Sequence, residues 1–227
     1  MPAAILFDLP HGGDKAWGLD PPYRRLGIEA VERASETFRL GTAGAGYGAF
    51  AGGIKGGTGS ASVVSSDGFT VGAIVAVNSA GSTLAPGTRT FWAAPYEMER
   101  EFGGLGVQGL GARPDEWGTI APDPKPRQNT TIACIATDAR LDPGEIKRVA
   151  IMAQDGMARA IRPVHAPFDG DVVFALSTGR RELPEPRTYT VARLGALAAD
   201  VLSRAIARGV YEATTWPDCA VRAYRDG

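Results

Sequence analysis

The chain of 227 residues is long enough for one large domain, or two small ones, with a sizeable hydrophobic core. Its 24 Lys and Arg residues balance 25 Asp and Glu residues, and the basic residues are scattered. This balance removes the electrostatic argument for a nucleic-acid partner or an acidic membrane surface. No apolar run approaches the roughly 20 residues of a membrane-spanning helix, so a membrane partner is not expected either.

The N-terminus has the pattern of a strand that begins at once. Residues 2–9 are mostly apolar and are followed by His11-Gly12-Gly13, which ends the strand. The segment has no basic start, and its apolar run is too short for a signal peptide. Because a domain seldom opens directly with a core strand, we expect the chain to begin in the middle of a fold.

The cysteine and histidine content argues against a metal site. Cys134 and Cys219 have no CxxC spacing and predict neither a metal knuckle nor a disulfide framework. We therefore expect buried free thiols, a cytoplasmic location and no metal or cofactor. His11 is interpreted as a loop residue, and His165, which lies between prolines, as a structural one.

Residues 21–37 predict an amphipathic helix that Pro21 and Pro22 open. Its apolar residues share one face, and charged residues cover the others. The members of the apolar face are Leu26, Ala30, Val31 and Ala34.

Residues 41–59 are unusually rich in glycine and contain a single cation, Lys55. A loose match to a dinucleotide fingerprint lacks the preceding strand and following helix, and Lys55 is not followed by the Ser or Thr of a P-loop. The pattern instead indicates a backbone that passes very close to another element. Lys55 is a candidate for stabilising developing negative charge, and the alternative is a solvated turn lysine.

Residues 60–65 and 69–77 predict a β-hairpin across the turn at residues 66–68. The second strand is apolar on both faces, which predicts a sheet covered on both sides. It ends at Asn78, whose side chain could donate a hydrogen bond to an oxyanion in a cleft or cap a turn. Residues 82–128 are rich in Pro and Gly and predict long surface loops.

Residues 128–138 predict a buried strand around which the chain is organised. A proline-loaded run at residues 121–127 precedes it, and its first threonine, Thr130, follows Asn129. In the simpler interpretation Thr130 is an ordinary strand residue, since Thr has high β-propensity. In the other, the Asn129–Thr130 bond is cut and Thr130 becomes an N-terminal nucleophile.

The last part of the chain predicts a helix that starts at Asp142 with an Asp-Pro-Gly-Glu pattern, a strand at residues 172–177 and a helix at residues 188–214. Asp169 and Asp171 flank a glycine just before that strand. They are interpreted either as a turn or as a carboxylate pair that orients an amine or a hydroxyl at the mouth of the sheet.

Taken in this order, these segments resemble the L-aminopeptidase/D-esterase family, which includes β-peptidyl aminopeptidases and nylon-oligomer (6-aminohexanoate-oligomer) hydrolases. Each segment is modest alone, but five in the same order are specific, and together they span essentially the whole chain. The matching segments are residues 2–9, 52–62, 71–78, 129–133 with 136–139, and 162–171.

The resemblance implies an α/β fold, an αββα sandwich similar to N-terminal-nucleophile hydrolases, made as a precursor that cuts itself. Residues 1–227 would form a single domain, divided by cleavage into residues 1–129 and 130–227. The implied substrates are short peptides, β-peptides or ω-amino-acid oligomers, and relatives assemble into homo-oligomers. The residues that the resemblance assigns are Thr130 as the nucleophile freed after Asn129, Asn78 as the oxyanion donor, Lys55 as a second polar support, and Asp169 and Asp171 as the orienting carboxylates.

The chain departs from this family at its start, because members carry about another third of the family fold before the point where this sequence begins. Part of the cleft would then be absent, or supplied by another polypeptide. Two other functions stay open at this stage. One is an acyltransferase resembling ornithine acetyltransferase, which has a related self-cleaving Thr, and the other is a non-catalytic structural or partner-binding chain.

Overall fold

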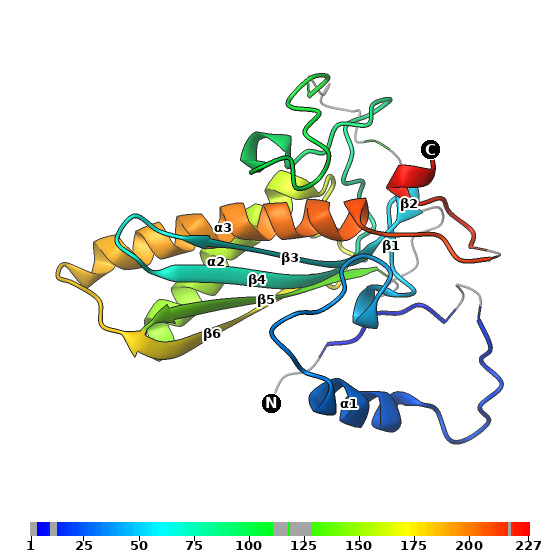
Figure 1. The fold of residues 1–227 in the computed structure, drawn as a ribbon, viewed down its shortest axis with the longest axis horizontal. Helices are drawn as coiled ribbons and strands as arrows, with labels where there is room; N and C mark the ends of the chain where they lie inside the picture. Colours follow the sequence, from blue (N-terminus) through cyan, green and yellow to red (C-terminus); the bar gives the residue numbers. More distant parts are fainter. Residues whose placement is uncertain (1–3, 10–12, 111–117, 119–128, 218) are drawn as a thin grey trace.

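The computed structural model describes residues 4–9, 13–110, 118, 129–217 and 219–227. Its centre is a four-stranded sheet in the order β3-β4-β5-β6 (Figure 1). β3 and β4 form the predicted hairpin, β4 pairs with β5 antiparallel, and β5 pairs with β6 in parallel. The four strands span Gly57–Val64, Thr70–Asn78, Thr130–Ala139 and Val172–Arg181.

Two long helices, α2 (Pro143–Ala160) and α3 (Arg187–Tyr211), pack on one face of this sheet (Figure 1). α2 supplies the crossover connection that the parallel pair of β5 and β6 requires. Both helices were predicted, although α3 ends three residues before the expected position. The core lies between the helices and the sheet, and its fully buried members include Val71, Val75, Ile135, Val149, Met157, Leu202 and Ile206.

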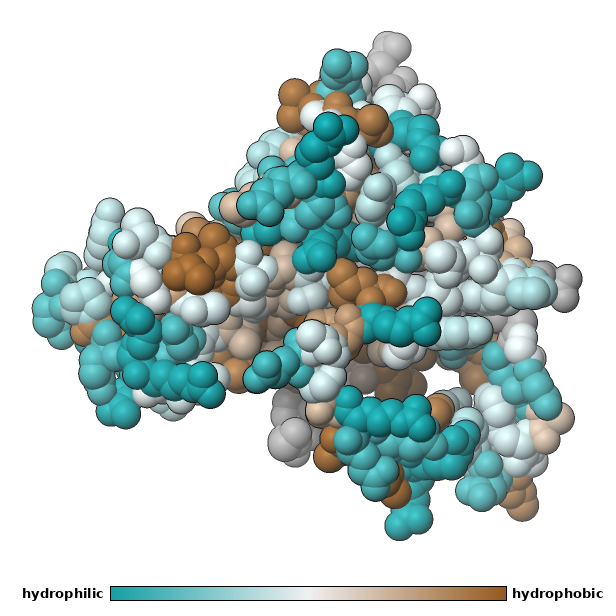
Figure 2. Space-filling view, viewed as in Figure 1, coloured by the Kyte–Doolittle hydropathy of each residue, from teal (hydrophilic) through white to brown (hydrophobic). Residues whose placement is uncertain are grey.

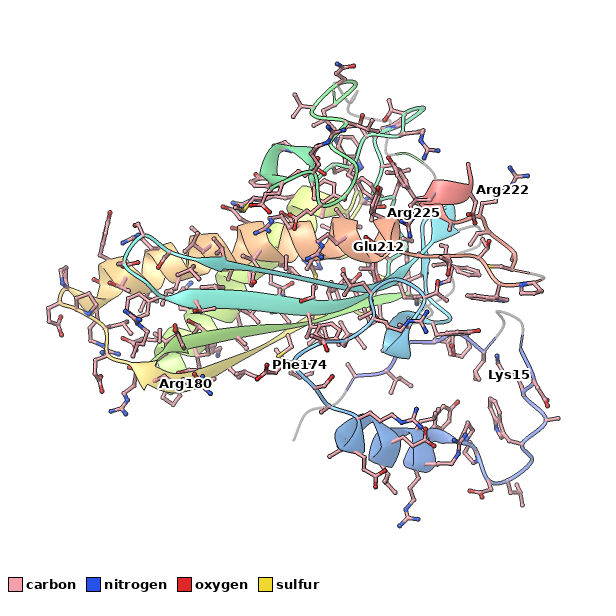
Figure 3. The ribbon with its side chains drawn as sticks, in the orientation of Figure 1. Lys15, Phe174, Arg180, Glu212, Arg222 and Arg225 are labelled. Atoms are coloured by element: carbon pink, nitrogen blue, oxygen red, sulfur yellow. The ribbon has the colours of Figure 1, made fainter. Side chains whose placement is uncertain are left out.

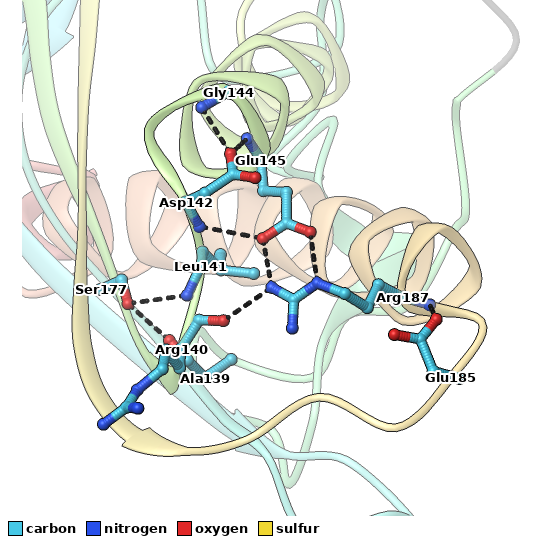
Figure 4. Close-up of polar contacts among 9 residues, drawn as sticks. All are labelled: Ala139, Arg140, Leu141, Asp142, Gly144, Glu145, Ser177, Glu185 and Arg187. Atoms are coloured by element: carbon cyan, nitrogen blue, oxygen red, sulfur yellow. Dashed lines mark hydrogen bonds and ion pairs between the residues drawn. The ribbon is translucent and has the colours of Figure 1, made fainter.

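The N-termini of α2 and α3 are held together by polar contacts (Figure 4). The Asp142 side chain accepts hydrogen bonds from the N–H groups of Gly144 and Glu145, at 2.7 and 2.8 Å. The Glu145 carboxylate accepts from the Asp142 N–H at 2.9 Å, which completes the predicted capping box. The same carboxylate pairs with Arg187 at 2.6 and 2.9 Å, and this ion pair joins the two helix starts.

The glycine-rich segment packs directly against α3. A Cβ atom added at Gly59 would lie 1.8 Å from the carbonyl oxygen of Ala205, and one at Gly57 would lie 2.3 Å from that of Gly209. Neither distance leaves room for a side chain. The prediction of a close backbone approach is therefore confirmed, and the partner is the C-terminal half of α3.

The outer edge of β3 is occupied by other parts of the chain. The main-chain carbonyls of Ser60 and Ser62 accept hydrogen bonds from Arg208 at 2.5 Å and Arg204 at 3.0 Å, both on α3. Gly41 forms a short antiparallel bridge to the beginning of the same strand. Both main-chain groups of Thr58 and the carbonyls of Ser60 and Ser62, which an edge strand would otherwise offer to solvent, are thus bonded within the chain.

Within the described residues, no helix covers the opposite face of the sheet. Ile74 and Leu176 on this face are 42% and 45% exposed, and Phe174 of β6 is partly buried (Figure 3). The prediction that the sheet is covered on both sides is wrong for this part of the chain. Cys134 also lies on this face, and both it and Cys219 are free thiols that are partly exposed, whereas buried thiols were expected.

The N-terminal segment differs most from the prediction. The described residues 4–9 form no strand, because no segment among the described residues pairs with their main-chain groups. α1 (Tyr23–Glu32) is shorter than expected and lies apart from the sheet (Figure 1). Its apolar residues are exposed, with Leu26 at 49% and Val31 at 78%, and brown apolar groups lie among teal polar ones on this lobe (Figure 2).

The remaining segments surround one end of the sheet. A small hairpin of β1 (Phe50–Ala51) and β2 (Ile54–Lys55) lies beside the C-terminal segment, where Arg222, Arg225 and Glu212 gather (Figure 3). Residues 82–110 contain only the short helix η2 (Ala94–Tyr96), in agreement with the predicted loops. The proline-loaded run at residues 121–127 lies outside the described residues.

Candidate active site

Thr130 is the first residue of β5 and lies directly opposite Asn78, the last residue of β4. Both side chains are buried, with exposed fractions of 7% for Thr130 and 1% for Asn78. Directly opposed residues of antiparallel strands project their side chains on the same face of a sheet. Thr130 and Asn78 therefore share the face that the helices leave uncovered.

The hydroxyl of Thr130 contacts the peptide bond that precedes it. Its Oγ1 donates a hydrogen bond to the carbonyl oxygen of Asn129 at 2.5 Å. The N–H of Gly170 donates to the same oxygen at 3.0 Å. The carbonyl of the Asn129–Thr130 junction is thus polarised by a main-chain donor and has the Thr130 hydroxyl beside it.

Sequence reasoning missed Gly170, which it treated only as the spacer between two aspartates. A Cβ atom at this position would lie 2.7 Å from Oγ1 of Thr130, too close for any side chain to fit without displacing the hydroxyl. The signal for this role was the glycine itself, because a backbone that must approach another group closely favours glycine.

Asp171 is almost fully buried, with 1% of its side chain exposed, and is held by three hydrogen bonds. Its Oδ1 accepts from the N–H of Thr131 at 2.8 Å. Its Oδ2 accepts from the N–H of His165 at 3.2 Å and lies 3.0 Å from Nδ1 of the same histidine. Burial alone raises the pKa of Asp171, but the bonds from His165 and Thr131 outweigh it and hold the pKa below its ordinary value.

Asp169 is in the opposite situation. It bridges Asn129 through the main chain, and both of its carboxyl oxygens are buried. Burial and then the charge of Asp171 raise the pKa of Asp169 to about 7, although the N–H groups of Ala80 and Gly170 partly offset this rise. Near neutral pH Asp171 is an anion, whereas Asp169 holds a proton in a large fraction of molecules. Such separation of two neighbouring pKa values is how active sites assign acid and base roles to a carboxyl pair.

Lys55 forms no hydrogen bond with Thr130, and its ammonium group points into the glycine-rich segment at residues 41–59. Its side chain is fully buried, and Nζ donates to the carbonyl oxygens of Gly46, Ala49 and Gly56 at 3.0, 2.8 and 2.7 Å. These contacts use all three protons of the ammonium group. The interpretation of Lys55 as a solvated turn residue is therefore wrong.

Lys55 and Asn78 are connected through one peptide unit. The carbonyl of Ala49 accepts from Lys55, and the N–H of the next residue, Phe50, donates to Oδ1 of Asn78 at 2.9 Å. The structure thus brings Thr130, Asn78 and the segment of the two aspartates together. Lys55 is linked to Asn78 through the peptide group between Ala49 and Phe50.

Burial lowers the pKa of Lys55 from its ordinary 10.5 to about 8, while Cys219 and Asp8 act in the opposite direction. Between these two pH values the unfolded chain binds more protons than the folded chain, so the free energy of unfolding rises with pH. Between about pH 8 and pH 10.5, the free energy of unfolding of the wild type should rise by on the order of 3 kcal/mol relative to that of a Lys55→Met variant, since one pKa unit is about 1.4 kcal/mol. Urea unfolding of both proteins at several pH values measures this gain, and parallel curves would contradict it.

Residues 3–222 match the sequence pattern described as peptidase family S58. The chain belongs to this family. Among the relatives of the S58 chain, an uncharacterised aminopeptidase of Mycobacterium tuberculosis (strain ATCC 25618 / H37Rv) is 40% identical over 235 residues, which cover 100% of this chain and 66% of the relative. A 6-aminohexanoate-oligomer endohydrolase of Kocuria sp. (strain KY2) is 35% identical over 85 residues, 34% of this chain and 24% of that protein.

The fold of the S58 chain is also found in a solved structure. The L-aminopeptidase D-Ala-esterase/amidase from Ochrobactrum anthropi, described as a variant of the Ntn hydrolase fold, is 25% identical with a TM-score of 0.57. The match covers 86% of this chain and 53% of that one, so the S58 chain spans about half of this solved relative. The predicted family resemblance and the Ntn-type fold are confirmed. In the described part of the chain, no helix has the length and hydropathy needed to cross a membrane.

Proposed function

We propose that this S58 chain is a self-processing amide hydrolase whose nucleophile is the hydroxyl of Thr130, released as an N-terminal residue. One observation carries this proposal. The Thr130 hydroxyl and the Gly170 N–H both form hydrogen bonds with the carbonyl oxygen of Asn129. A nucleophile and a main-chain donor on one carbonyl are the two elements that attack on an amide requires.

Self-cleavage would proceed by transfer of the acyl group from nitrogen to oxygen. Oγ1 of Thr130 bonds to the carbonyl carbon of Asn129, and the negative charge on the carbonyl oxygen is stabilised by the Gly170 N–H. The bond between that carbon and the Thr130 nitrogen then breaks, with Asp169 giving a proton to the nitrogen and regaining one from the hydroxyl. Water hydrolyses the resulting ester, which leaves a carboxyl group on Asn129 and a free amine and hydroxyl on Thr130.

After cleavage, Thr130 carries both the nucleophile and its base. An N-terminal amine has a pKa of about 7.7–8.0, so near neutral pH a sizeable fraction can accept the proton of the hydroxyl. No histidine is needed as a base. Asn78 would stabilise the oxyanion of the substrate, since its side chain lies on the same sheet face as Thr130 and its amide is fixed through Phe50.

The substrate class we propose is a linear amide with a free amino end, such as a short peptide or an ω-amino-acid oligomer. A relative that matches over the whole chain is named an aminopeptidase, and the 6-aminohexanoate-oligomer endohydrolase matches a shorter segment. Lys55 would act on the reaction through the peptide that holds Asn78. Asp171 would align the beginning of β5 through its bond to the Thr131 N–H.

The direct test is the intact mass of the purified protein, combined with N-terminal sequencing. We expect two fragments, residues 1–129 and 130–227, and a sequence that begins at Thr130. Release of amine from an amino-acid p-nitroanilide or a 6-aminohexanoate oligomer should accompany cleavage. A protein that stays in one piece and hydrolyses neither substrate would contradict the proposal and favour a non-catalytic role.

A further inference from the structure

Of the two histidines in the chain, only His165 lies among the residues that the structure describes, and the proposed mechanism does not use it. It lies on the segment between α2 and β6, with 40% of its side chain exposed. Its φ of 54° places it in the left-handed region, which is uncommon for residues other than Gly, although Asn, Asp and His adopt it more often than the rest. Such strain persists where the surrounding contacts require it, and it is concentrated at functional sites.

In this conformation His165 makes two contacts with Asp171. The main-chain N–H and Nδ1 of His165 both approach the same oxygen, Oδ2, at 3.2 and 3.0 Å. The other oxygen of Asp171 accepts from Thr131, the residue after the proposed nucleophile. One carboxylate thus links the exposed imidazole to Thr131, the second residue of β5, directly after the Asn129–Thr130 junction.

We propose that His165 is a positioning residue of the site. It holds Asp171 as an aligned carboxylate, so that the carboxyl group that keeps a proton is that of Asp169, whose main chain bridges to Asn129 at the junction that is cut. This inference rests on the proposed function, because it explains why Asp169 and not Asp171 carries the proton that self-cleavage uses. It assigns to the imidazole a role in regulation by pH, in place of the structural role that the sequence suggested.

The charges around His165 support this assignment. Two titratable groups face the imidazole among the described residues, Asp171 in direct contact and Asp169 further away. The hydrogen bond to Asp171 raises the pKa of His165 above its ordinary 6.5, although burial acts against the rise. A cation beside two close carboxyl groups favours ionisation of both, so its loss should move the second ionisation of the pair to higher pH.

Two substitutions separate the hydrogen bond from the charge. His165→Asn keeps a donor at the position of Nδ1 and tolerates the left-handed backbone, but it cannot become charged. His165→Gly tolerates the same backbone and removes both donor and charge. His11→Gln, which changes the only other histidine of the chain, is the matched control.

The measurement is the rate of self-cleavage against pH, followed by intact mass on chain freshly made by cell-free synthesis. We expect the rate to fall on the alkaline side as Asp169 loses its proton, and this fall to move to higher pH in both variants at position 165. At the optimum, His165→Gly should be about ten- to a hundredfold slower, the effect of losing a hydrogen bond to a charged group, and His165→Asn should stay near the wild type. His11→Gln should match the wild type in rate and profile.

The outcomes separate this inference from the proposed function. A merely structural role would lower the stability of the variants but leave the pH of the alkaline fall unchanged, and that result would overturn the inference. If the wild type does not cleave, the proposed function fails while the pairing can still be tested. NMR titration of the imidazoles should show a raised pKa for His165 that falls when Asp171 is changed to Asn. An unchanged titration would refute the pairing itself.

Discussion

Replacing Thr130 by valine should leave the chain in one piece and abolish amide hydrolysis. Valine keeps the branched shape that fills this buried position, and it removes only the hydroxyl that contacts the Asn129 carbonyl. Loss of a catalytic nucleophile lowers turnover by on the order of 10⁶-fold in a hydrolase that acts through an acyl-enzyme. Intact mass and the rate of p-nitroanilide hydrolysis measure the two effects.

The matched variant is Thr130→Ser, which keeps the hydroxyl and the amine and loses only a methyl group. We expect it to cleave and to retain hydrolysis at a reduced rate. Two fragments from the valine variant, or turnover comparable with the wild type, would show that another group is the nucleophile. An uncut but correctly folded serine variant would point to the same conclusion.

Replacing Gly59 by alanine should destabilise the fold by about 3 kcal/mol or more, the range of severe overpacking. The added methyl group would lie 1.8 Å from the carbonyl oxygen of Ala205 and 2.7 Å from the nitrogen of Gly209, both in the rigid backbone of α3. β3 and α3 would have to move apart, and the core between them would open. The urea midpoint of the variant measures the loss.

Gly72→Ala provides the control in the neighbouring strand. The nearest atom to a Cβ at Gly72 is 3.8 Å away, which is an ordinary contact. We expect this variant to unfold close to the wild-type midpoint. If Gly59→Ala were as stable as Gly72→Ala, the close packing of β3 against α3 would be refuted.

The part of the fold that sequence could predict is the part encoded by local patterns. The hairpin of β3 and β4, the capping box at Asp142 and the buried face of α3 all follow from turn chemistry, capping and periodicity. The N-terminal strand failed because a strand depends on a neighbour as much as on its own residues, and residues 4–9 have none among the described residues. The apolar pattern of α1 likewise predicted a helix, but it could not predict which element, if any, would pack against the apolar face of that helix.

The candidate site was predictable as a set of residue types but not as a set of contacts. Thr130, Asn78 and the two aspartates lie where strands end, and the order of the strands brings those ends together. The direction of Lys55 could not be derived, because the three carbonyls that bind its ammonium come from a loop whose path no local rule sets. Gly170 acts through its main-chain N–H, a group that sequence does not distinguish from that of most other residues. His165 contacts Asp171 through its imidazole as well as its N–H, but the positive φ that brings the two residues together could not be derived from the flanking prolines.

Arg204 and Arg208 of α3, which bind the edge of β3, affect whether another extended chain can pair with this sheet. Arg204 is held in place by Glu101, with Nε–Oε1 and Nη2–Oε2 distances of 2.5 and 3.0 Å, so it is an ordered donor and not a loose surface side chain. A foreign strand that tried to extend the sheet at this border would have to displace Arg204 and Arg208 and break that ion pair. Fibrillar self-association and peptide capture by strand addition are therefore both disfavoured on the β3 side.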